Sequence, residues 1–332
     1  MWCAVQCAVQ GKGHLRSNVP CQDKTYSIST KNFYAVSLAD GAGSCSLSHV
    51  GATQVTRTVC ELLQNKFDLY LNNDDGVAVK RDILHTIIDE LNKSAVINDC
   101  KLKDLSSTLL FVAVKHDYFI LGHIGDGVIG YLKNNTLKVA SSPNNGEFVN
   151  TTIFTTSNTA FASMKLIKGN IENIDSFILM SDGTESVFYK KSNSTLSEGV
   201  KKIILLSKIL PEHEIEKQLT KFFENKVRNY TSDDCSLVCL SNVSSFNGFV
   251  SLPLSIKRDL LRISPKVAKR IIKKYLNILD FLYYNNEQTL KNISKKVHIK
   301  PSYLEKKIDK LCNIGFVECH DEMYKLNLIN YE

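Results

Sequence analysis

The chain has 332 residues, of which 43% are hydrophobic and 23% are charged. This composition is typical of a globular protein with one large core or two domains, and it excludes an intrinsically disordered chain. No basic segment followed by a long apolar run opens the sequence, and no later apolar run approaches a membrane span, which favours a cytoplasmic location. Ten scattered cysteines without a C-x-x-C pair predict reduced, mainly buried thiols rather than a zinc site or a disulfide framework.

The net charge of +7 comes entirely from the end of the chain. Residues 1–253 contain 25 Lys and Arg against 25 Asp and Glu, whereas residues 254–332 contain 16 against 9. A neutral body followed by a basic tail predicts two domains. For the second domain the charge favours an acidic partner such as nucleic acid, with a merely solvated basic face as the alternative.

Strand-like and helix-like segments alternate in groups along the body. A turn at Gly11-Lys12-Gly13 separates the first two of the β-type runs, which occur at 5–9, 25–29, 33–39, 108–114, 118–123, 128–132, 137–140, 160–165, 176–180 and 236–240. Apolar residues fall at helical spacing within 50–63, 83–95, 196–209 and 214–227. Sheets with helices grouped in pairs predict an α+β fold built in layers.

Acidic residues recur where the predicted strands end. The positions are Gln22-Asp23, Asp40-Gly41, Gly125-Asp126-Gly127, Ser181-Asp182-Gly183 and Asp233-Asp234. Each pair taken alone is more often a simple turn, but their repetition is what an oxygen-rich binuclear metal site requires. Carboxylate and carbonyl oxygens without nearby His or Cys favour Mg²⁺ or Mn²⁺, and a glycine after Asp40 opens the Gly41 carbonyl to such an ion.

An ordered series of motifs resembles the protein phosphatase 2C family, the metal-dependent Ser/Thr phosphatases. The series is Gln22-Asp23, Asp40-Gly41-Ala42-Gly43, Ser107-Thr108, Gly125-Asp126-Gly127, Ser181-Asp182-Gly183 and Asp233-Asp234-Cys235-Ser236. It is most similar to the bacterial branch, in which Gly-x-x-His, here Gly11 to His14, precedes Pro20-Cys21-Gln22-Asp23. The resemblance implies a four-layer α-β-β-α sandwich over residues 1–245. It also implies hydrolysis of phosphoserine and phosphothreonine by a metal-activated water.

The resemblance also implies roles for single residues at a site of two or three Mg²⁺ or Mn²⁺ ions. Asp40 bridges two ions, and the carbonyl of Gly41 binds one of them. Asp182 and Asp233 complete the first ion's ligands. Asp126 serves an additional, more weakly held ion.

The residues before the second predicted strand depart from the family pattern. Asp23 and Gln22 would contact an ion through water, but most family members carry Glu where this chain has Gln22, so one negative charge is missing. The family's phosphate-binding arginine stands four residues before the acidic pair, where this chain has Asn18. Arg16 is the nearest arginine and a candidate phosphate ligand, although a loop arginine is often only solvated.

A further departure leaves two hypotheses about activity. The histidine that follows Asp-Gly in the eukaryotic enzymes, a candidate general acid, is replaced here by Ala42. His14 is the nearest substitute, although a lone histidine is more often a structural hydrogen-bonding group. The first hypothesis is a phosphatase whose substrate is a phosphoprotein, the target of a Ser/Thr kinase. The second is a catalytically weak phosphatase-like sensor that regulates through the tail.

The tail has an organisation of its own. After a predicted linker at 246–264, helical spacing occurs within 267–284, 289–297 and 303–312, and two strands follow at 315–318 and 323–326. This order resembles a winged helix-turn-helix domain over residues 265–332. The third helix mixes acids with lysines and lacks residues suited to base edges, whereas the first is more basic. DNA contact and protein docking therefore stay open, and no membrane contact is expected.

Overall fold

The computed structural model describes residues 1–143, 152–243 and 246–328 of the chain. These residues form two compact units, each described separately below. The first comprises Met1–Ile204 and Leu219–Asn242, and the second comprises Leu205–Gln218 and Val243–Glu332. The predicted linker at 246–264 contains two short helices, α8 (Phe246–Ser251) and α9 (Leu254–Leu260).

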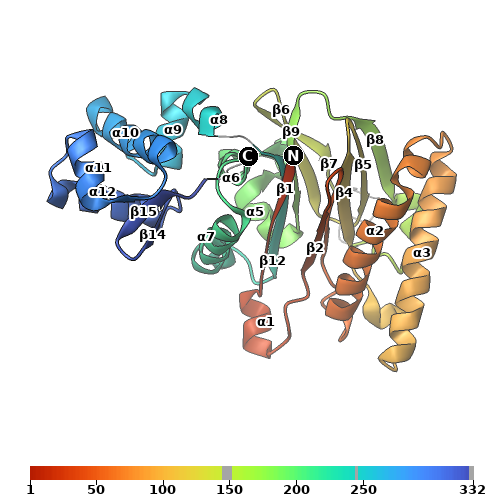
Figure 1. Cartoon of the computed structure of the whole chain (residues 1–332). Helices are drawn as coiled ribbons and strands as arrows, with labels where there is room; N and C mark the ends of the chain where they lie inside the picture. The colour runs from red at the N-terminus through yellow and green to blue at the C-terminus, as the bar shows by residue number, and fades with distance from the viewer. Residues whose placement is uncertain (144–151, 244–245, 329–332) are drawn as a thin grey trace. The chain divides into compact units, whose positions relative to one another are not determined.

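Two five-stranded antiparallel sheets form the centre of the first unit (Figure 1). One has the order β1-β12-β9-β6-β7, with β1 Trp2–Val9, β6 Val128–Lys133, β7 Thr136–Ser141, β9 Ile174–Met180 and β12 Cys235–Asn242. The other has the order β2-β3-β4-β5-β8, with β2 Lys24–Ser29, β3 Phe33–Ala39, β4 Leu109–Lys115, β5 Tyr118–Ile124 and β8 Lys165–Asn170. An apolar core that includes Val36, Leu110 and Val238 joins residues of the two sheets.

Two long helices, α2 (Ser48–Leu71) and α3 (Gly76–Ile97), cover the outer face of the second sheet (Figure 1). The shorter helices are α1 Lys12–Ser17, α4 Ala160–Ser163, α5 Glu185–Phe188, α6 Glu198–Ser207 and α7 Glu212–Asn225. The Cys7 thiol of β1 lies 3.8 Å from the hydroxyl of Thr220 in α7, so part of α7 packs on the first sheet. The helices and sheets agree with the predicted α+β layers.

Burial of strand β3 explains why every residue in it except Ser37 is hydrophobic. All seven of its residues are buried. Ala35 and Ala39 face the core under the helices, whereas Val36 and Leu38 face the core between the sheets. Because side chains alternate along a strand and both faces of β3 are covered, neither face carries solvated residues. The strand therefore holds its C-terminal end, where Asp40 follows, in a rigid setting.

Two local predictions are wrong. Residues 160–165 were predicted as a strand, but they form α4 and the first residue of β8. Strand β8 is half exposed and polar, so its pairing with β5 decides its conformation more than its own pattern does. The predicted turn at Gly11-Lys12-Gly13 is the start of helix α1, whose first hydrogen bond runs from the Leu15 amide to the Gly11 carbonyl.

The second unit contains a helical group and a small sheet. Its remaining elements are α10 Lys269–Asn285, β13 Gln288–Thr289, α11 Leu290–Val297, α12 Pro301–Asn313, β14 Val317–His320 and β15 Met323–Leu326. The three strands pair in the order β13-β15-β14. Buried residues from all three helices and from the segment before β14 form its core: Ile272, Leu279, Ile293, Leu304, Leu311 and Phe316. The three predicted helices and the hairpin are thus present.

Two findings bear on the compositional predictions. Among the described residues, no helix is both long and apolar enough to span a bilayer. The ten cysteines are in the reduced form, and four of them are buried: Cys7, Cys60, Cys235 and Cys239. Cys319 is exposed and the other five are partly buried, so the prediction of mainly buried thiols is only partly right.

Gly51 in α2 provides a test of the packing between this helix and the segment 102–105. A Cβ atom at Gly51 would lie 1.9 Å from the carbonyl oxygen of Leu105, whereas one at Gly76 in α3 would meet nothing within 4 Å. Alanine normally stabilises a helix relative to glycine, but overpacking at Gly51 should cost about 1–3 kcal/mol. We expect Gly51→Ala to lower the thermal unfolding midpoint and Gly76→Ala to leave it equal or higher. Equal midpoints for both variants would contradict this packing.

Candidate metal centre

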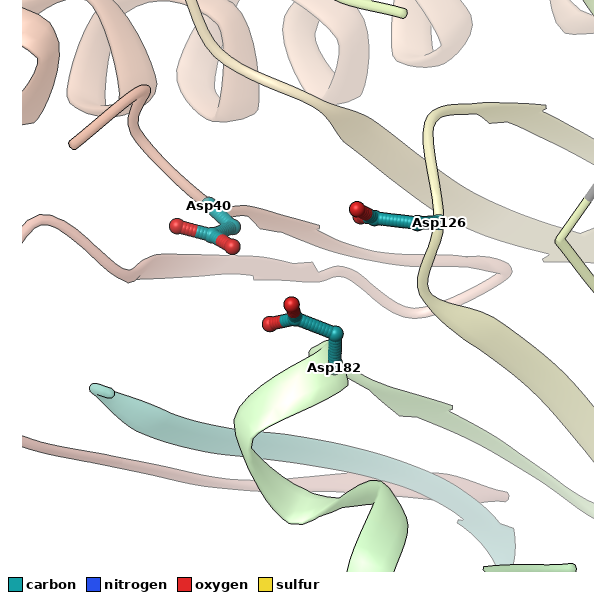
Figure 2. A group of neighbouring side chains, drawn as sticks. All are labelled: Asp40, Asp126 and Asp182. Carbon is teal, nitrogen blue, oxygen red and sulfur yellow. The ribbon is translucent and has the colours of Figure 1, made fainter. Parts of the chain in front are cut away.

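Three aspartates from different strand ends of the first unit meet at one place. Asp40 follows β3, Asp126 lies between β5 and β6, and Asp182 follows β9. One carboxylate oxygen from each lies within 4.8 Å of the other two. Figure 2 shows the three side chains pointing toward one another. Oxygens gathered in this way are the donor set that hard divalent cations prefer.

The backbone around Asp40 is held on both sides. Its amide donates a hydrogen bond of 2.9 Å to the Thr108 hydroxyl, and its carbonyl accepts one of 2.8 Å from the Thr108 amide. The next residue, Gly41, forms an antiparallel bridge with Ser107. A Cβ atom on Gly41 would lie 2.8 Å from the Cβ of Ser48, so this position has room only for glycine. These contacts fix the direction of the Asp40 carboxylate.

Burial and the charges of neighbouring acids disfavour the charged forms of Asp40 and Asp182. Burial, with the charges of Asp23, Asp182 and Asp233, raises the pKa of Asp40 well above its usual range. Burial, then the charges of Asp126 and Asp233, raises the pKa of Asp182 to about 7. The Oδ1 atom of Asp182 is buried and accepts no hydrogen bond from the described residues. A divalent cation would offset both the cost of burying these charges and their mutual repulsion. The residues therefore fit the predicted Mg²⁺ or Mn²⁺ site.

Gln22 and Asp23 are almost completely buried, with 2% and 1% exposure, and the Gln22 carbonyl accepts a hydrogen bond of 3.3 Å from the Gly41 amide. Burial raises the pKa of Asp23 to about 6. The side-chain amide nitrogen of Gln22 donates a hydrogen bond of 3.3 Å to the Cys45 carbonyl. Its side-chain oxygen is buried and accepts no hydrogen bond within the described ranges. That oxygen is therefore available as an acceptor for water, as expected for a residue that contacts an ion indirectly.

Asp234 is a structural residue that the sequence did not distinguish from Asp233. Its two carboxylate oxygens accept hydrogen bonds from the backbone amides of Gly11, at 2.6 Å, and Gln22, at 2.5 Å. His14 Nδ1 lies 2.9 Å from the same carboxylate. Asp234 thereby ties the start of β12 to α1 and to the Gln22 loop. The only sequence signal was the acidic pair itself.

The structure places the other predicted residues at different distances from the cluster. Asp233 is partly buried, and its charge contributes to the raised pKa of both Asp40 and Asp182. His14 contacts Asp234 and not the three-aspartate cluster. Arg16 is exposed on α1. The individual roles of these residues stay predictions.

A buried histidine that the sequence analysis missed supports the turn with Asp126. His123 is 2% exposed, and burial together with the charge of Lys165 lowers its pKa to about 4. Its neutral ring therefore donates from Nε2 to the Gly125 carbonyl at 3.0 Å and accepts at Nδ1 from the Ser141 hydroxyl at 2.6 Å. Nothing in the local sequence pattern marks this histidine, because its partner Ser141 lies on another strand.

Comparison with known proteins supports the family inferred from the motifs. The sequence profile described as Protein phosphatase 2C matches residues 10–224, and the chain belongs to that family. Serine/threonine-protein phosphatase 3 of Escherichia coli (strain K12) is 25% identical over 172 residues, which cover 49% of this chain and 66%, just under two thirds, of that protein. The predicted enzyme class, protein serine/threonine phosphatase, is confirmed at the level of the family.

Solved structures support the α+β fold of the protein phosphatase 2C type. A structure described as a bacterial serine phosphatase is 16% identical, with a TM-score of 0.53 and coverage of 73% of this chain and 98% of its own. Serine/threonine phosphatase Stp1 from Staphylococcus aureus is also 16% identical, with a TM-score of 0.52 and coverage of 74% and 96%. At these identities the likeness concerns the fold alone.

The raised pKa of Asp182 predicts a pH-dependent stability of the metal-free protein. Folded Asp182 keeps its proton up to a pKa of about 7, whereas an unfolded aspartate loses it above about 4. Stability should therefore fall as pH rises between these values, and Asp182→Asn should make that fall smaller by removing the contribution of Asp182. Thermal unfolding in EDTA across this pH range measures the effect, with exposed Asp74→Asn as the control. Parallel profiles for wild type and Asp182→Asn would contradict the raised pKa.

Proposed function

We propose that this chain is a metal-dependent protein phosphatase that hydrolyses phosphoserine and phosphothreonine in protein substrates phosphorylated by a Ser/Thr kinase. The convergence of Asp40, Asp126 and Asp182 carries the proposal. Asp40, Asp182, Asp233 and the Gly41 carbonyl would hold two Mg²⁺ or Mn²⁺ ions, and Asp126 would hold an additional one. When bound, such ions supply a nucleophilic water near neutral pH and neutralise the transferring phosphoryl group.

The chain's own residues orient this chemistry. The two hydrogen bonds with Thr108 hold Asp40 in place, and those of His123 hold the turn that carries Asp126. Gln22 and Asp23 would accept hydrogen bonds from solvent around the ions. The contact with Asp234 favours a structural role for His14, which fixes helix α1, where exposed Arg16 is the candidate phosphate ligand.

The second hypothesis, a catalytically weak sensor module, depends on Gln22 and Ala42. The Gln22 amide supplies no charge where the family has a carboxylate, so the second ion would be held less tightly. The four retained aspartates at the other motif positions support catalysis instead. The hydrolysis assay that tests the phosphatase proposal, described below, also decides between the two hypotheses.

We further propose that residues 265–332 form a winged helix that docks a macromolecule. The order of α10, α11 and α12 followed by the β14–β15 hairpin supports this proposal. On α12, Lys307 and Lys310 point back toward the Tyr275 ring, with Nζ atoms 4.4 Å and 5.6 Å from its centroid. Exposed Lys306 is flanked by Glu305 and Asp309, so α12 presents a mixed surface. Any contact with nucleic-acid phosphates would therefore fall mainly to α10.

Asp40→Asn tests the phosphatase proposal. Removing the central negative charge should lower turnover about a thousandfold, because metal-assisted charge stabilisation supplies several kcal/mol. The measurement is hydrolysis of p-nitrophenyl phosphate with Mn²⁺, without metal and with EDTA. Asp74→Asn, an exposed substitution in the same unit, should retain activity. Wild-type turnover that EDTA leaves unaffected, or full activity of Asp40→Asn, would refute the proposal.

The charge on α10 gives a prediction for nucleic-acid binding by the full chain. Replacing four exposed residues of α10 with alanine should weaken binding to duplex DNA and flatten its salt dependence by about 0.9 per lost phosphate contact. The residues are Lys269, Arg270, Lys273 and Lys274. Because α12 lacks base-reading side chains, we expect little preference among duplex sequences.

The matched control removes four exposed cations from the first unit: Lys31, Lys101, Lys103 and Lys226. This control should bind DNA as the wild type does. If the wild type shows no salt-sensitive binding at low ionic strength, the second unit is better explained as a docking module for a protein.

A further inference from the structure

An open groove of about 310 Å³ begins at Asp182 and extends away from the metal centre within the first unit. Its walls come from the segment after β9 and from the loop before β12. The residues that matter are Asp182, Glu185, Tyr189, Lys191, Tyr230 and Thr231. Because the groove is open along its length, it suits an extended chain better than an enclosed small molecule. None of the functions described above uses it.

The groove contains an ion pair whose two members differ in exposure. Lys191 Nζ lies 2.7 Å from Glu185 Oε2, and the side chains are 67% and 15% exposed, respectively. The hydrogen bond with Glu185, and then the charge of Glu185, raises the pKa of Lys191, with contributions from Asp182 and Asp126. The ammonium group is therefore charged at neutral pH. It faces solvent while its counterion lies behind it.

Glu185 holds this lysine with only part of its hydrogen-bonding capacity. Its Oε1 atom is buried and accepts no hydrogen bond from the described part of the chain. The ammonium group of Lys191 has three donors, and one oxygen of Glu185 occupies only one of them. The remaining donors are not used by this ion pair, and Lys191 lines the groove. A second carboxylate could thus bind without breaking the existing pair.

Tyr230 adds an aromatic surface to the same groove. It follows η4 (Val227–Asn229) and is 72% exposed. An exposed tyrosine offers a large contact area at low entropic cost, which is the reason such side chains are frequent where proteins bind polypeptides. The groove therefore combines one accessible cation with one accessible aromatic ring beside the metal-binding carboxylates.

We propose that this groove binds the substrate polypeptide that flanks the phosphorylated residue, and that Lys191 selects an acidic side chain there. The proposal rests on the proposed phosphatase site, because a phosphoryl group at the metal centre places its flanking residues near Asp182. Each extended residue advances the chain by about 3.3 Å, so a side chain one to three positions away can reach Lys191. A basic side chain at that position would be repelled.

The test compares two phosphoserine peptides that differ only in carrying Glu or Lys on both sides of the phosphoserine. The wild type should favour the acidic peptide about fivefold in kcat/KM with Mn²⁺, which is the scale of one exposed charge pair. Lys191→Gln should bring the ratio near one, and Lys191→Glu should reverse it. Lys190→Glu, the same charge change at the adjacent exposed residue outside the groove, should keep the wild-type ratio.

A second readout separates this proposal from the proposed activity. The affinities of both peptides are measured by fluorescence anisotropy with the Asp40→Asn protein, alone and combined with each of the three substitutions. A charge preference in binding that follows Lys191 supports the groove even if the wild type hydrolyses neither peptide. Hydrolysis or binding without a charge preference, or equal effects of Lys191→Glu and Lys190→Glu, would overturn it.

Discussion

The mutual repulsion of buried carboxylates is the constraint on which the first unit depends. Asp40, Asp126 and Asp182 have oxygens within 4.8 Å of one another, and burial raises the pKa of Asp40 and of Asp182. Repulsion between these carboxylates lowers the stability of the folded protein and pushes the strand ends apart. The backbone must therefore hold the strand ends in place. A two-sheet core with both faces of β3 covered supplies that rigidity. A bound divalent cation would convert the repulsion into binding energy.

The supporting hydrogen bonds follow from this constraint. Two of the loops that carry an acid are held by neighbouring side chains: Thr108, from a distant segment, holds Asp40, and His123, which also contacts Ser141 on β7, holds the turn of Asp126. Asp234 holds the Gln22 loop through a backbone amide. The donors at Asp40 and at the turn of Asp126 are neutral, so they restrain the geometry without neutralising the cluster. The negative potential that a cation requires is therefore preserved.

In the second unit, the number of basic residues alone gives an incomplete account of the surface. Lys307 and Lys310 lie against Tyr275, and burial lowers the pKa of both. Their stems contribute to packing, and only part of their charge is available to a partner. The exposed cations of α10 are therefore more accessible to a partner than Lys307 and Lys310 of α12. The distinction between packed and exposed lysines also applies to Lys191, which is exposed and therefore accessible to a ligand.

The sequence by itself determined the family, most of the order of strands and helices, and the three aspartates that converge at one place: Asp40, Asp126 and Asp182. These features depend on residue types at strand ends and on local periodicity. Tertiary structure alone decided the conformation of 160–165, the roles of His123 and Asp234, and the groove beside Asp182. Each of these depends on pairing between segments far apart in the chain, such as Gly11 with Asp234 or β5 with β8. A local sequence pattern does not reveal such pairing, because the stabilising free energy arises only when the two segments come into contact.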